Sequence, residues 1–80
     1  MVIDDDVKLS DLIKDFLEPH KYRVVCFNNP VVALSKIKSQ KPDLIILDIT
    51  MPEMDGFQVL TKIREDSKTP VIMLTARGEV

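Results

Sequence analysis

The sequence has few of the residues that build covalent or phosphate-binding frameworks: one cysteine and two glycines among 80 residues. A lone Cys26 excludes an internal disulfide and fits a reducing compartment. Two glycines leave no phosphate-cradling loop of the kind that nucleotide-dependent enzymes use. No apolar run approaches the ~20 residues of a membrane span, and three acids stand where a signal peptide would be basic. These absences predict a cytoplasmic protein without a membrane partner.

Acidic and basic residues are nearly balanced. Eleven basic and 13 acidic residues leave a formal net charge of −2, so nothing indicates direct binding to nucleic acid. No Gly/Ser linker, low-complexity tract or internal repeat divides the chain. A polypeptide of this size buries only about 60% of its unfolded surface, which makes its stability marginal. We therefore expect residues 1–80 to form a single small domain.

What the sequence does have is four short apolar runs, most of them apolar on consecutive residues. Each is too short for a helix, and unbroken apolar strands are typical of a parallel sheet buried on both faces. The runs are "MVI" (1–3), "YRVVCF" (22–27), "LIIL" (44–47) and "VIML" (71–74).

Helical patterns lie between these strands. The first runs from Leu9 to Pro19 and places Leu12, Ile13, Phe16 and Leu17 on one apolar stripe. In "NNPVVALSKIKS" Asn29 is a predicted N-cap with Pro30 at the first helical position, and Ala33, Leu34 and Ile37 face inward. In "DGFQVLTKIRED" Asp55 is the predicted cap, with Phe57, Leu60 and Ile63 on one face. Alternating strands and helices predict a doubly wound α/β fold.

Acidic and hydroxyl groups follow three of the predicted strands. Asp4, Asp5 and Asp6 follow the first, Asp48 the third and Thr75 the fourth. Ligands of open parallel sheets bind beyond the carboxyl ends of the strands, so these groups are expected at one edge. If the first and third strands are neighbours, carboxylates about 5 Å apart repel by roughly 3 kcal/mol per pair.

Such a group of acids needs a shared proton or a divalent cation. An all-oxygen site suits Mg²⁺. His20 and Cys26, the residue types that zinc prefers, lie on other segments, which argues against a zinc site. Structural explanations stay open for single residues: Asp6 directly precedes a helix and is favoured as its cap, and Thr75 could be an ordinary turn residue. The combination at one edge favours a functional acidic pocket.

The sequence resembles the receiver domain of two-component response regulators. The resemblance lies in "VIDDDVKL" after the first strand, "LIILDITMPEMDGF" around the third and "PVIMLTA" through the fourth. It covers essentially the whole chain, and the middle motif is the most specific. The fold that it implies is the flavodoxin-like receiver fold, truncated here after the fourth strand, so that residues 1–80 make one incomplete receiver domain.

The resemblance also implies a chemistry for particular residues. Asp48 would be the phosphoacceptor, whose carboxylate attacks phosphorus to give an aspartyl phosphate. Asp4 and Asp5 would hold Mg²⁺ together with Asp48 and the backbone carbonyl of Thr50. "MPEMDG" would frame Asp48, with Gly56 leaving the site unobstructed.

Two further residues match the switch of the family. Thr75 would be the hydroxyl that moves to the phosphoryl group, and Ala76 the small residue that leaves it room. The implied partners are a sensor histidine kinase as donor and an effector domain beyond the chain end. Such a domain assists its own phosphorylation but is not a conventional enzyme.

One departure from the family pattern concerns the carboxyl end. Family members carry a lysine after a fifth strand, and this sequence stops at Val80 before it. We therefore expect Mg²⁺ binding but poor phosphorylation of the 80-residue chain. The strand 71–74 would be an apolar sheet edge, and such edges seek partners, so dimerisation, domain swapping or aggregation is expected.

Two other functions are alternatives to the phosphoacceptor role. A pseudo-receiver would use the same fold as a protein-interaction module without phosphoryl chemistry, although Asp48 and the acid pair are all present. A haloacid dehalogenase-type hydrolase also uses a strand-end aspartate, but it needs a second acid two residues later. Position 50 is threonine, which argues against that hydrolase.

Overall fold

The chain folds around a parallel sheet of four strands in the order β2-β1-β3-β4. The computed structural model describes residues 1–49, 51 and 54–74, so the predictions made for Thr50, Thr75 and Ala76 lie outside the described residues. The strands are β1 (Val2–Ile3), β2 (Cys26–Phe27), β3 (Ile45–Asp48) and β4 (Val71–Leu74). The predicted parallel α/β sheet is confirmed, with β1 and β3 as neighbours and β4 at one edge.

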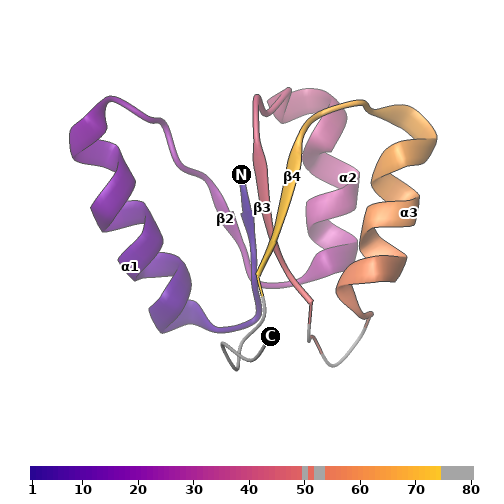
Figure 1. The fold of residues 1–80 in the computed structure, drawn as a ribbon, viewed down its shortest axis with the longest axis horizontal. Coiled ribbons are helices and arrows are strands. Elements are labelled where there is room, and N and C mark those ends of the chain that lie inside the picture. Colours follow the sequence, from indigo (N-terminus) through magenta and orange to yellow (C-terminus); the bar gives the residue numbers. More distant parts are fainter. Residues whose placement is uncertain (50, 52–53, 75–80) are drawn as a thin grey trace.

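Helices cover both faces of this sheet, but unequally. The helices are α1 (Val7–Leu17), α2 (Pro30–Gln40) and α3 (Gly56–Asp66), with a short 3₁₀ turn η1 (Glu18–His20) after α1. Figure 1 shows α2 and α3 side by side on one face and α1 alone on the other. No helix of the described segments has the length and apolar character needed to cross a bilayer.

Each of the helices α1, α2 and α3 begins at a side-chain cap, as the sequence predicts. Asp6 accepts a hydrogen bond from the N–H of Leu9, and Asn29 accepts from the N–H groups that follow Pro30. Asp55 and Gln58 form a reciprocal capping box at the start of α3. Because such caps satisfy N–H groups that a helix leaves unpaired, they fix where each helix starts. The expectation that Asp6 serves as a cap is confirmed.

The core lies between the sheet and the α2–α3 layer. Its buried residues come from the strands β1 and β3, the helices α2 and α3 and the segment after β3. They are Ile3, Ala33, Ile37, Ile45, Leu47, Met51, Val59 and Ile63. The inward positions of Ala33 and Ile37 are confirmed, but the prediction for Phe57 is wrong, since its side chain is 62% exposed and Val59 is buried. At about 100° per residue, Phe57 lies roughly 120° away from Ile63, whereas Val59 lies about 40° away.

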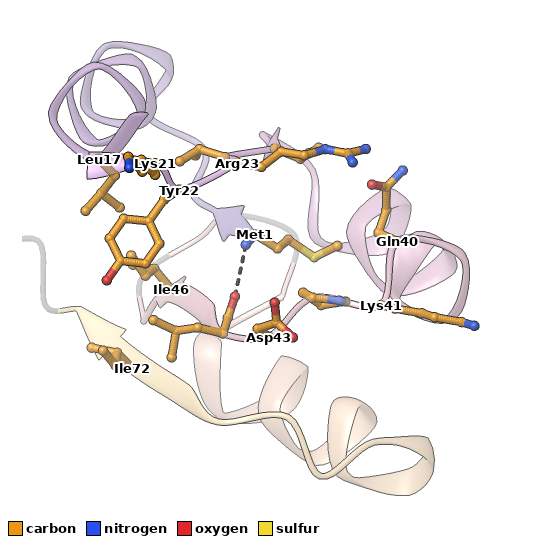
Figure 2. A pocket seen from close by; sticks show the side chains of 14 residues that line it. Met1, Leu17, Lys21, Tyr22, Arg23, Gln40, Lys41, Asp43, Ile46 and Ile72 are labelled. Atoms are coloured by element: carbon orange, nitrogen blue, oxygen red, sulfur yellow. Dashed lines mark hydrogen bonds between the residues drawn. The ribbon is translucent and has the colours of Figure 1, made fainter. Parts of the chain in front are cut away.

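β2 is shorter than predicted. The sequence predicts a strand over 22–27, yet only Cys26 and Phe27 pair with β1, which itself has two residues. Parallel strands form a ladder only as far as the shorter partner reaches. At this end of the sheet a cavity of about 710 Å³ is lined by residues 21–25 and 40–44, together with Met1, Leu17, Ile46 and Ile72 (Figure 2). There the Met1 ammonium donates a 2.9 Å hydrogen bond to the carbonyl of Leu44, and its partial burial lowers its pKa.

The predicted apolar stripe of α1 is only half buried. Ile13 and Leu17 are half-buried, whereas Leu12 and Phe16, on the other flank of the stripe, are 65% and 71% exposed. Because α1 is the only helix on its face of the sheet among the described elements, one flank of its stripe has nothing to pack against.

Candidate acidic site

The acidic site lies at the carboxyl ends of two adjacent strands. Asp4 and Asp5 directly follow β1, and Asp48 is the last residue of β3. The strands are in register with Ile3 opposite Leu47, which brings the residues that come next face to face. Asp4, Asp5 and Asp48 each offer a carboxylate oxygen, and these atoms lie within 4.8 Å of one another. The expected convergence of these acids on one edge is therefore present.

Asp4 is held rigidly at the bottom of this site. Its side chain is 2% exposed, and its Oδ1 accepts a 2.8 Å hydrogen bond from the N–H of Asp6. The Oδ2 atom is buried and has no hydrogen-bond partner in the described part of the chain. Burial raises the pKa of Asp4; the bond from Asp6 opposes the shift, and the nearby charges of Asp48, Asp5 and Asp6 add to it.

An amide at the end of β2 supports Asp4 from behind. The Nδ2 of Asn28 donates to the backbone carbonyl of Asp4 at 2.9 Å and also reaches the Oγ of Ser10 at 3.5 Å. The N–H of Asp4 in turn donates to the carbonyl of Phe27. Asn28 and Ser10 were not predicted as positioning residues. A signal was present for Asn28, since it also follows a strand at the same edge of the sheet.

Asp48 is positioned from the other side by the start of α3. The N–H of Gly56 donates to the carbonyl of Ile49 at 2.7 Å, directly after Asp48, which is itself buried. A Cβ at position 56 would lie 2.7 Å from the Cα of Ile49 and 2.8 Å from the carbonyl oxygen of Asp48. Glycine is therefore required because α3 approaches the strand end so closely, a more local reason than the open site that the sequence analysis expected.

The side chains present fit a small divalent cation. Two carboxylates are buried and one, Asp5, is exposed on the open side. A buried carboxylate oxygen without a partner is costly, and the buried Oδ2 of Asp4 is such an atom. Carboxylate oxygens with room for water are the ligands that Mg²⁺ takes in proteins, so Asp4, Asp5 and Asp48 are the residues that could hold it.

Comparison with known proteins identifies the family. A family model described as the response regulator receiver domain matches residues 1–80, the whole chain. The chain belongs to the response regulator receiver domain family. This family serves two-component phosphorelay signalling, and the match confirms the resemblance seen in the sequence.

Individual relatives agree with this assignment. The regulatory protein VanRc of Enterococcus gallinarum is 39% identical over 79 residues, which are 99% of this chain and 34% of that protein. The N-terminal receiver domain of a Methanoculleus marisnigri JR1 protein superposes with a TM-score of 0.88 at 35% identity, covering 99% of this chain and 67% of that one. The BeF3-activated receiver domain of Klebsiella pneumoniae RstA gives 0.87 at 32% identity, covering 94% and 64%. The chain thus spans about a third of the curated relative's length.

The charge buried at Asp4 makes a prediction about stability. We expect Asp4→Asn to raise the free energy of unfolding by about 1–3 kcal/mol at neutral pH without Mg²⁺, because it removes a repelling buried charge and keeps the acceptor for Asp6. Since burial raises the folded-state pKa of Asp4 above its ordinary value, the wild-type penalty is fully present above that folded pKa. The penalty is lost progressively as the pH falls from the folded pKa to the lower pKa of the unfolded chain, so the gap between the variants closes toward acid.

Urea unfolding followed by circular dichroism, at one protein concentration and with EDTA or Mg²⁺, measures this gap. Mg²⁺ should stabilise the wild type and leave Asp4→Asn almost unchanged. Asp11→Asn, an exposed acid on α1, is the matched control and should behave like the wild type. Equal stability of wild type and Asp4→Asn in EDTA at neutral pH would contradict this reading of the site.

Proposed function

We propose that this receiver domain accepts a phosphoryl group from a sensor histidine kinase onto Asp48, in a reaction that depends on Mg²⁺. The observation that carries the proposal is the convergence of Asp4, Asp5 and Asp48 within 4.8 Å, with one oxygen of Asp4 buried and unpartnered. Three carboxylates so close repel one another and would destabilise a protein that serves only as a binding module. The same arrangement is useful where a divalent cation must be held next to a phosphoryl group.

The position of each acid suggests its role in the transfer. A carboxylate oxygen of Asp48 forms the new bond to phosphorus while the bond from phosphorus to the donor's imidazole nitrogen breaks, and that nitrogen keeps the electron pair. Asp4, fixed by Asp6 and Asn28, and Asp5 would hold the cation together with Asp48. When bound, Mg²⁺ supplies the positive charge that lets one anion approach another.

The proposal extends to three residues outside the described segments. The carbonyl of Thr50 would complete the cation ligands, the Thr75 hydroxyl would bond the phosphoryl group as the switch, and Ala76 would leave space for it. The RstA relative supports this part, because it is described as BeF3-activated and a beryllium trifluoride group resembles a phosphoryl group in shape and charge. The curated relative is about three times as long as its matched segment, so we propose output through a further effector domain, in the cytoplasm.

Phosphoryl uptake from a small donor tests the proposal. The whole gene product that contains these residues is incubated with acetyl phosphate and run on a phosphate-affinity gel, with intact-mass measurement in parallel. We expect one retarded species that carries a single phosphoryl group, that forms with Mg²⁺ and does not form when EDTA is present. Absence of any modified species with both reagents present would sink the proposal and favour the pseudo-receiver, a phosphorylation-independent interaction module.

A further inference from the structure

The hydrogen bonding between β1 and β2 continues for one residue beyond the two strands. The last strand pair joins Ile3 to Phe27. Asp4 comes next, and its N–H still donates to the carbonyl of Phe27 at 3.1 Å. The carbonyl of Asp4 accepts from the Nδ2 of Asn28 at 2.9 Å, where a longer parallel ladder would use a backbone N–H. Both backbone polar groups of Asp4 are therefore held by the end of β2.

The two carboxylate oxygens of Asp4 differ in their hydrogen bonds. Oδ1 accepts a 2.8 Å hydrogen bond from the N–H of Asp6. Oδ2 is buried and has no hydrogen-bond partner among the residues that the structure describes. Asp4 is thus fixed at its N–H, its carbonyl and its Oδ1, which leaves Oδ2 as the oxygen that a cation would satisfy. A carboxylate held in this way keeps Oδ2 at one position.

Ser10 orients the amide that holds the Asp4 carbonyl. Of the two ends of the Asn28 amide only Nδ2 can donate, so the amide must turn this end toward Asp4. The Oγ of Ser10, which is buried on α1, lies 3.5 Å from the same Nδ2 and is its second acceptor. Two acceptors on one side favour the orientation that supports Asp4. Asn28 as a whole is exposed, so its replacement leaves the core of the fold intact.

We propose that the amide of Asn28 sets the affinity of the acidic site for Mg²⁺, because it is the positioning residue that fixes the backbone of Asp4. This inference rests on the function proposed above, in which Asp4, Asp5 and Asp48 hold the cation. Mg²⁺ requires short bonds in a near-ideal octahedron, whereas Ca²⁺ accepts longer bonds and variable geometry. Loss of the amide lets Asp4 shift, and this loosening weakens Mg²⁺ binding more than Ca²⁺ binding.

Calorimetric titration with MgCl₂ and with CaCl₂ tests this inference on the whole gene product that contains these residues. We expect Asn28→Ala to raise the dissociation constant for Mg²⁺ by about three- to tenfold, the range for loss of one hydrogen bond, and that for Ca²⁺ by less than about twofold. Circular dichroism should show a folded protein at the titration temperature, because Asn28 is exposed. Gln40→Ala removes another exposed amide, at the far end of α2. It is the matched control and should leave both constants unchanged.

The outcomes separate this inference from the function on which it rests. A wild-type protein that binds no Mg²⁺ would overturn both. A wild-type protein that binds Mg²⁺, with an Asn28→Ala variant that binds it equally well, would overturn the role of Asn28 alone. Weakening of Mg²⁺ and Ca²⁺ binding by the same factor would also overturn that role, since it would show a general loosening of the site rather than the loss of a defined position for Asp4.

Discussion

Asp48→Ala is expected to abolish phosphoryl uptake from acetyl phosphate in the presence of Mg²⁺. The change removes the proposed nucleophile and leaves Asp4 and Asp5, which would still offer carboxylate oxygens to the cation. Removing a nucleophile eliminates covalent chemistry rather than slowing it. The readout is the retarded species on the phosphate-affinity gel, which should fall to the level of a reaction without donor.

Asp43→Ala provides the control for this experiment. Asp43 precedes β3 at the opposite end from Asp48, and its side chain is exposed near the Met1 ammonium. The variant thus removes an acid near β3 without any change to the acidic site, so uptake should remain at the wild-type level. Persistent labelling of Asp48→Ala would show that another residue accepts the group, and would refute the role proposed for Asp48.

Gly56→Ala is expected to be the most damaging conservative substitution in the described part of the chain. The added methyl group meets backbone atoms at 2.7 and 2.8 Å, and backbone cannot turn aside as a flexible side chain can. The strand end must move, which also strains the 2.7 Å hydrogen bond from Gly56 to Ile49. We expect a loss of about 2–4 kcal/mol in the free energy of unfolding. A chain of this length has only about 4–12 kcal/mol in total.

Because Asp48 immediately precedes Ile49, Gly56→Ala should also reduce Mg²⁺ affinity and phosphoryl uptake while the chain is still folded. Urea unfolding and magnesium titration by calorimetry measure the two effects. Lys36→Ala, an exposed change on α2, is the control and should shift stability by less than about 0.5 kcal/mol. A Gly56→Ala chain as stable as the wild type would show that the close approach of α3 to β3 is not maintained in solution.

Much of the fold follows from local pattern. The helix starts were predictable because Asp6, Asn29 and Asp55 are short polar side chains that cap a helix by local hydrogen bonds. β3 and β4 were predictable because unbroken apolar runs bounded by polar residues have few other conformations. The extent of β2 was not predictable, since pairing depends on how much of β1 lies beside it.

The faces of the helices were predicted less well than their limits. Phe57 was expected on the same face as Ile63, yet Phe57 is exposed, and Val59 is buried beside Ile63 instead. Leu12 and Phe16 have a regular apolar spacing, yet they face an open groove. Periodicity shows that a helix has an apolar side, but it does not show which part of that side a neighbouring element covers.

The sequence by itself determined that strands and helices alternate, that the strands are parallel and that acids follow the first and third strands. These are properties of chemistry and spacing along the chain. Only the tertiary structure decided that β1 and β3 are adjacent, that the Oδ2 of Asp4 is buried without a partner and that Asn28 supports Asp4. The reason is that burial and hydrogen bonding depend on which distant segments lie side by side, and the order of the strands in the sheet sets this.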